Sequence, residues 1–135
     1  MQNILLILLL SVLLLTGCAA ASNPTEATTY RQITMTEAVK MMEKEANYVL
    51  LDVRTEQEFA AGHIPNAILI PNETIGMQEI PLLPDKDQLI MVYCRSGNRS
   101  KQASSKLVQL GYTNIVEIGG INSWPGEIVT DESAK

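Results

Sequence analysis

A cysteine that follows an apolar run is the residue of this sequence best suited to covalent chemistry. Cys94 comes directly after the apolar stretch 89–93, and Gly97 favours a tight turn from that stretch into a helix. The backbone N–H groups of such a turn converge on one point, and the start of a helix adds partial positive charge there. Arg95 and Arg99 add two full positive charges nearby. Because this environment stabilises a thiolate, we expect the pKa of Cys94 to lie below the ordinary thiol value of about 8.5, and we interpret Cys94 as a nucleophile.

Alternating helix and strand patterns surround this loop and must position it. Two capping-box pairs, Thr34 with Glu37 and Thr55 with Glu58, predict the starts of two helices. A third helix is predicted over 100–110 from its apolar spacing. Buried strands are predicted from apolar runs at 48–53, 67–70, 89–93 and 114–118. Apolar strands that alternate with helices indicate an α/β domain with a central, mainly parallel sheet flanked by helices.

Ligands of parallel sheets bind beyond the carboxyl ends of the strands, and polar residues of this chain are predicted to lie there. Cys94 is at one such end, and Asp52 and Arg54 are at another. We expect Asp52 and Arg54 to frame the adjoining loops by hydrogen bonds and ion pairs, with Arg54 pairing with Glu58, rather than to act on substrate. His63, the single histidine, follows a turn glycine. A role as general base is open to it, but a structural hydrogen bond is favoured.

The N-terminus resembles the signal peptide of a bacterial lipoprotein. The apolar run 4–15 suits the core of a signal peptide, being shorter than the roughly 20 residues that span a bilayer. The sequence Leu15-Thr16-Gly17-Cys18 resembles a lipobox. The resemblance implies cleavage before Cys18, lipid attachment to its sulfur, and a membrane-anchored protein facing outside the cytoplasm, in the periplasm or on the cell surface. An ordinary secretory signal or an uncleaved anchor is the alternative.

These patterns divide the chain into four segments. Residues 1–17 are the predicted signal peptide, 18–30 a flexible lipidated tether rich in small polar residues, 31–130 the folded domain and 131–135 a disordered tail. If Cys18 carries lipid, Cys94 has no partner in the chain and stays free; a disulfide between them requires that lipidation does not occur. An inert buried thiol is the other alternative for Cys94.

Charge and composition argue against two kinds of partner. The net charge of −5 at pH 7 disfavours nucleic acid as a partner. One histidine and one free cysteine cannot build a closed metal site unaided, and we expect neither a metal nor another cofactor.

Several short motifs follow one another along the chain. In order, they are Leu51-Asp52-Val53-Arg54, Glu58-Phe59, Gly62-His63-Ile64-Pro65-Asn66-Ala67, Cys94-Arg95-Ser96-Gly97-Asn98-Arg99-Ser100, Gly111-Tyr112, and Gly119-Gly120-Ile121 with Trp124. Together they resemble the motifs of the rhodanese family, specifically its single-domain sulfurtransferases. Asn66 stands where glycine is common in the family, and asparagine tolerates the left-handed backbone that glycine adopts. The resemblance implies a three-layer rhodanese-like domain over 31–130.

The resemblance also implies a mechanism. The Cys94 thiolate takes the sulfane sulfur of a small anionic donor such as thiosulfate, and the resulting persulfide passes that sulfur to cyanide or a thiol acceptor. The loop residues expected to bind the donor are Arg95, Ser96, Gly97, Asn98 and Arg99. For Arg99 the alternative is a salt bridge that orients the loop, and for Arg95 it is a solvated side chain.

Two further functions compete with sulfur transfer. Phosphatases of the Cys-x5-Arg type need five residues between the nucleophile and the arginine, whereas four lie between Cys94 and Arg99, so the loop suits one sulfur atom better than a phosphate. A phosphatase or arsenate reductase is therefore the less favoured enzyme. The other competitor is a module that binds a partner or carries sulfur without turnover.

Overall fold

A computed structural model describes residues 29–76 and 78–131 of the 135-residue chain. The predicted signal peptide 1–17, Cys18, most of the tether and residues 132–135 of the tail lie outside the described residues. Within 29–76 and 78–131, no helix is both long enough and apolar enough to cross a bilayer.

A five-stranded sheet forms the centre of the domain, and every pair of neighbouring strands is parallel. Its strands, in spatial order, are β1 (Arg31–Gln32), β5 (Ile115–Gly120), β4 (Leu89–Cys94), β2 (Tyr48–Asp52) and β3 (Ile68–Leu69). The predicted α/β class with a parallel sheet is confirmed. The edge strand β1 was not expected from the sequence, because two exposed residues carry no apolar pattern.

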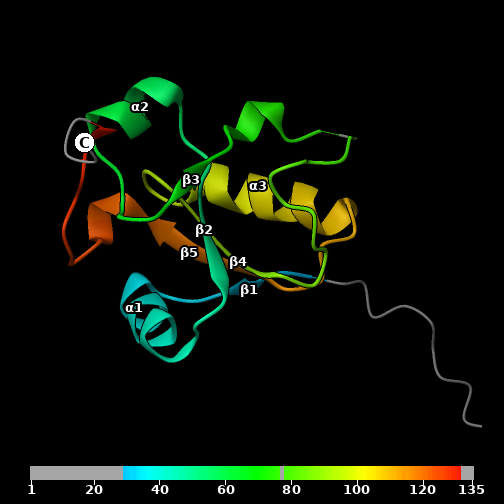
Figure 1. The fold of residues 1–135 in the computed structure, drawn as a ribbon, viewed down its shortest axis with the longest axis horizontal. Helices are drawn as coiled ribbons and strands as arrows, with labels where there is room; N and C mark the ends of the chain where they lie inside the picture. The colour runs from blue at the N-terminus through cyan, green and yellow to red at the C-terminus, as the bar shows by residue number, and fades with distance from the viewer. Residues whose placement is uncertain (1–28, 77, 132–135) are drawn as a thin grey trace, which may run out of the picture.

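Helices cover both faces of the sheet and give the domain three layers (Figure 1). The helices are α1 (Met35–Lys44), α2 (Glu56–Ala61) and α3 (Asn98–Gln109), with two short 3-10 turns, η1 (Asn72–Thr74) and η2 (Ile121–Ser123). Along β4, Ile90 and Val92 pack in the same cluster as Leu107 of α3, whereas Met91 packs in the cluster that contains Met35 of α1. Successive residues of a strand point to opposite faces, so a strand apolar at every position can support helices on both sides.

The predicted helix starts are confirmed by hydrogen bonds. The hydroxyl oxygen of Thr34 accepts from the N–H of Glu37, and the Glu37 carboxylate accepts from the N–H of Thr34; Thr55 and Glu58 make the same reciprocal pair. Asn66 has φ of 66°, the left-handed conformation expected for an asparagine in a glycine position.

Candidate functional site: the Cys94 loop

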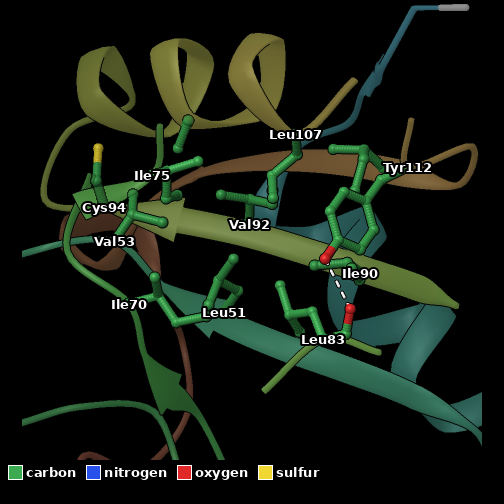
Figure 2. Close-up of a cluster of buried hydrophobic side chains, with 12 residues drawn as sticks. Leu51, Val53, Ile70, Ile75, Leu83, Ile90, Val92, Cys94, Leu107 and Tyr112 are labelled. Carbon is green, nitrogen blue, oxygen red and sulfur yellow. Dashed lines mark hydrogen bonds between the residues drawn. The ribbon is translucent and has the colours of Figure 1, made fainter. Parts of the chain in front are cut away.

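Cys94 is the last residue of β4, at the carboxyl edge of the sheet where the site was expected. The chain then passes through residues 95–97 and enters α3, which begins at 98 rather than at the expected 100. Figure 2 shows the Cys94 side chain at the end of a buried apolar cluster, with its sulfur pointing away from the other side chains drawn. The residue is only 1 % exposed. The sulfur therefore lies beneath the loop and not on an open surface.

The sulfur of Cys94 lies among hydrogen-bonding groups of this loop. The N–H of Gly97 donates to Sγ over 3.0 Å, and the Oγ of Ser100 lies 3.5 Å from Sγ. Burial raises the pKa of the Cys94 thiol, but hydrogen bonding with the Ser100 hydroxyl and with the N–H groups of Ser100, Gly97 and Ser96 outweighs it, so the pKa lies below the ordinary thiol value. Burial alone suits an inert cysteine; the lowered pKa indicates a nucleophile.

Two glycines allow the loop to close around the sulfur. Gly97, just before α3, has φ of 109°, a conformation that side chains disfavour. Gly120 at the end of β5 lies so close to the loop that a Cβ there would overlap the carbonyl of Arg95 and come within 2.6 Å of the Ser96 Cα. The N–H of Asn122 donates to the same Arg95 carbonyl over 3.3 Å. The segment after β5 thus fixes the loop from outside.

Arg99 is tied to α2 by a bidentate ion pair. Its two terminal nitrogens lie 2.7 and 2.8 Å from the carboxylate oxygens of Glu58. The hydrogen bond from Arg99, together with those from Thr55, outweighs partial burial and lowers the pKa of Glu58 to about 2. The same carboxylate also caps α2, so one side chain joins that helix to the first turn of α3. Arg99 thus forms a salt bridge that can orient the loop, which is the alternative to donor binding that the sequence analysis raised for this residue.

Arg54 has a different partner from the one expected. The prediction that it pairs with Glu58 is wrong: Nη2 of Arg54 lies 2.7 Å from Oδ2 of Asp52 and donates to the carbonyl of Gly62 over 2.7 Å. Asp52 is at the end of β2, two residues before Arg54, and both side chains are buried. Arg54 makes several charge-assisted hydrogen bonds to the Asp52 carboxylate, and such bonds are stronger than neutral ones. The pair frames the loop after β2, which is the role expected of Asp52 and Arg54.

His63 makes the contacts of a structural histidine. Its Nδ1 lies 2.9 Å from the carbonyl oxygen of Phe59, and its ring stacks on the Phe59 ring at 3.7 Å between centroids. Its backbone pairs with Val129 in an isolated antiparallel bridge.

The remaining loop residues lie on the surface around the buried sulfur. Arg95, Ser96 and Asn98 are exposed. Arg95 lines a shallow hollow of about 360 Å³ with residues of the α2 region and with Asn122. Ser96 and Gly97 line a second hollow, of about 320 Å³, on the side of β1 and α1. The loop residues predicted to bind the donor are thus together, except that Arg99 is held by Glu58.

Two residues at the site were not among the predicted site residues. Ser100 is buried, and its hydroxyl lies 3.5 Å from Sγ of Cys94 and 2.5 Å from a carboxylate oxygen of Glu117. A signal for Glu117 was present, because it is the one charged residue in the apolar run 114–118 and buried carboxylates are rare without a specific partner. In the described part of the chain, no group of three or more His, Cys, Asp or Glu residues could hold a metal ion.

Comparison with known proteins agrees with this geometry. The family model described as "Rhodanese-like domain" matches residues 34–127. The chain belongs to the rhodanese family. A sulfurtransferase of Allochromatium vinosum is 44% identical over 79 residues, which cover 56% of this rhodanese and 70% of that protein. The adenylyltransferase and sulfurtransferase UBA4 of Candida albicans is 34% identical over 95 residues, covering 65% of this chain and only 22% of that protein.

Solved structures show the same fold. The crystal structure of a rhodanese-related protein from Thermoplasma volcanium matches with a TM-score of 0.62 and 32% identity, covering 76% of this chain and all of that one. This rhodanese is therefore a sulfurtransferase by family, and such enzymes have a sulfur donor and a sulfur acceptor as partners.

Proposed function

We propose that this rhodanese moves sulfane sulfur from a small anionic donor such as thiosulfate, through a persulfide on Cys94, to cyanide or a thiol. The observation that carries the proposal is the hydrogen-bonded sulfur of Cys94, whose pKa is lowered although the residue is buried. A thiolate is the nucleophilic form of cysteine, and the chemistry needs no other nucleophile.

In the first half-reaction, the Cys94 thiolate attacks the outer sulfur of thiosulfate. A new S–S bond forms, the S–S bond of thiosulfate breaks, and sulfite leaves with the bonding electron pair. In the second, cyanide attacks the outer sulfur of the persulfide and leaves as thiocyanate, which restores the Cys94 thiolate. The N–H groups that face Sγ, that of Gly97 among them, can stabilise negative charge on sulfur in both steps.

The burial of Cys94 favours a particular shape of donor. A residue that is 1 % exposed favours a small donor that carries its reactive sulfur at the tip, as thiosulfate does. Exposed Arg95 would attract the dianion and stabilise the departing sulfite, with Ser96 and Asn98 beside it. Arg99 would hold the loop through Glu58 instead of binding the donor.

Sulfur storage without turnover is a second candidate, because the same burial slows the entry of an acceptor. The number of thiocyanate molecules released per protein separates the two. An enzyme releases many when thiosulfate and cyanide are in excess, whereas a carrier releases no more than its preloaded sulfur.

The test uses the matched variants Cys94→Ser and Cys18→Ser, which make the same change at the two cysteines of the chain. We expect Cys94→Ser to abolish thiocyanate production and Cys18→Ser to retain it. Equal thiocyanate production by Cys94→Ser and by the unaltered protein would contradict the proposal.

We also propose that the protein is anchored in the bacterial cell envelope by lipid on Cys18, outside the cytoplasm. The lipobox Leu15-Thr16-Gly17-Cys18 after an apolar run supports this. Labelled palmitate should enter the protein in bacterial cells, and Cys18→Ser should prevent it. Labelling that survives in Cys18→Ser would contradict the proposal.

A further inference from the structure

A buried chain of three side chains runs from the sulfur of Cys94 to a carboxylate on the neighbouring strand. Cys94 ends β4, Ser100 lies in the first turn of α3, and Glu117 lies in β5. The Oγ of Ser100 is 3.5 Å from Sγ of Cys94 and 2.5 Å from Oε1 of Glu117. The three residues are 1 %, 0% and 3% exposed, so water has little access to the path between them.

The hydroxyl of Ser100 has one hydrogen and several acceptors. Besides Glu117, the carbonyl oxygens of Gly97 and Gly119 lie 2.9 and 3.4 Å from Oγ. Of these three acceptors, Glu117 makes the shortest contact and is the one that can carry a charge. When Ser100 donates to Glu117, the lone pairs of its oxygen are left to accept from the thiol of Cys94. The orientation of the chain is then thiol to hydroxyl to carboxylate.

Glu117 receives only neutral donors. Its Oε1 accepts from Ser100 and, over 2.8 Å, from the N–H of Gly119. Within the described ranges, the ion pairs are Arg54 with Asp52 and Arg99 with Glu58, so no cation neutralises Glu117. A buried carboxylate with only neutral partners costs free energy in the charged form, which favours a role beyond stability.

Other charged groups face the same region from the neighbouring elements. Lys101 of α3 and Glu37 of α1 line the hollow that Glu117 also lines, while Gln32 of β1 lies opposite Glu117 in the sheet and is uncharged. Lys101 and Glu37 are both exposed, so their charges are screened by water.

We propose that Glu117 accepts the proton of Cys94 through Ser100 and so acts as a positioning residue for the reactive thiolate. The S–H bond of Cys94 breaks as its proton passes to Oγ of Ser100, and the hydroxyl proton of Ser100 passes to Oε1 of Glu117. The products are a thiolate and a neutral carboxylic acid, so the total charge of the interior is unchanged. The use made of this thiolate rests on the proposed function; the proton transfer itself does not.

The consequence is that the thiolate of Cys94 forms in two steps. While one proton is shared along the path, a fixed fraction of Cys94 is thiolate, and the amount of thiolate does not change with pH. The amount rises again only when the second proton leaves. A cysteine that ionises alone gives a single step.

The experiment measures the alkylation rate of Cys94 by iodoacetamide against pH in the full chain, with mass spectrometry of the Cys94 peptide. We expect two steps separated by a plateau in the unaltered protein. We expect one step in Glu117→Gln, whose amide oxygen can still accept from Ser100 and Gly119 but cannot take the proton.

Glu37→Gln is the matched control. It removes one negative charge from the same hollow and keeps the capping box, in which glutamine can replace glutamate. The two steps should survive in it. A single alkylation step in the unaltered protein overturns the proposal, and this result does not depend on whether the variants fold. Two alkylation steps in Glu117→Gln overturn it as well.

Turnover separates this inference from the proposed function. With thiosulfate and cyanide, Glu117→Gln should lower kcat on the order of 10²-fold, the lower range for loss of a positioned proton acceptor, and Glu37→Gln should leave kcat within about twofold. If alkylation shows two steps but no turnover is measured, the proton path stands and the proposed function is wrong. If turnover is measured but alkylation shows a single step, the proposed function stands and the proton path is wrong.

Discussion

The substitution Glu58→Gln tests how firmly the cysteine loop is held to α2. Glutamine can keep the capping box with Thr55, because either Glu or Gln serves at that position. What it removes is the charge that pairs with both terminal nitrogens of Arg99 at 2.7 and 2.8 Å. The change therefore isolates the ion pair between the two helices.

The magnitude follows from the pKa of Glu58, which lies at about 2 compared with 4.5 for an ordinary glutamate. At about 1.4 kcal/mol per pH unit, this difference corresponds to about 3 kcal/mol. Thr55 contributes part of it, and the paired side chains of Arg99 and Glu58 are 26% and 27% exposed, so water screens them. We expect Glu58→Gln to lower the free energy of unfolding by about 1–2 kcal/mol at pH 7, and Tm by about 5–15 °C.

The dependence on pH has a definite sign. The pKa of Glu58 is lower in the folded state than in the unfolded state, so the pair stabilises the protein fully above pH 4.5 and progressively less as the pH falls toward 2. Urea unfolding followed by circular dichroism, at pH 7 and at pH 3, measures the difference between the two proteins. Equal stability at pH 7, or a difference that is unchanged at pH 3, would refute this reasoning.

Three other substitutions test the core and the loop. Leu107→Ala leaves a cavity beneath α3, where Leu107 is fully buried, and should cost about 2–5 kcal/mol in thermal or urea unfolding; a loss below 1 kcal/mol would contradict the packing. Gly120→Ala places a methyl group against the carbonyl that follows Cys94, and should lower thiocyanate turnover about tenfold or more, whereas Gly76→Ala, which meets nothing within 4 Å, should not change it. Tyr93→Phe removes the hydroxyl that accepts from the N–H of Ile64 over 3.2 Å, and should cost about 1–3 kcal/mol, visible as a lower urea midpoint; an unchanged midpoint would mean that water replaces the hydroxyl.

Local signals in the sequence predicted most of the fold. The capping boxes at Thr34 and Thr55, the apolar run before Cys94 and the left-handed Asn66 each depend on neighbours within a few residues, and the structure has them as expected. The edge strand β1 was missed because its pairing is made by the backbone of β5, which leaves no trace in the side chains of two exposed residues.

The site was predicted less completely, because its partners come from distant segments. Arg54 and Arg99 each form an ion pair with an acidic residue. The sequence alone predicted that Arg54 would pair with Glu58, whereas in the structure Glu58 pairs with Arg99, which is 41 positions away. Ser100 and Glu117 meet only when α3 packs on β5. Motif reasoning located the loop of Cys94, and tertiary packing decided which groups surround its sulfur.

The short strand β1 also decides where the chain enters the domain. It runs parallel to β5, and its Arg31 pairs with Val116 near the start of that strand, whereas Cys94 pairs with Gly120 at the end. Four residues of strand separate the two levels by about 13 Å. The chain thus enters the domain toward the amino ends of the strands, whereas Cys94 lies at their carboxyl ends. An anchor ahead of β1, as proposed for Cys18, would therefore attach at the end of the sheet away from Cys94 and need not cover the entrance to its sulfur.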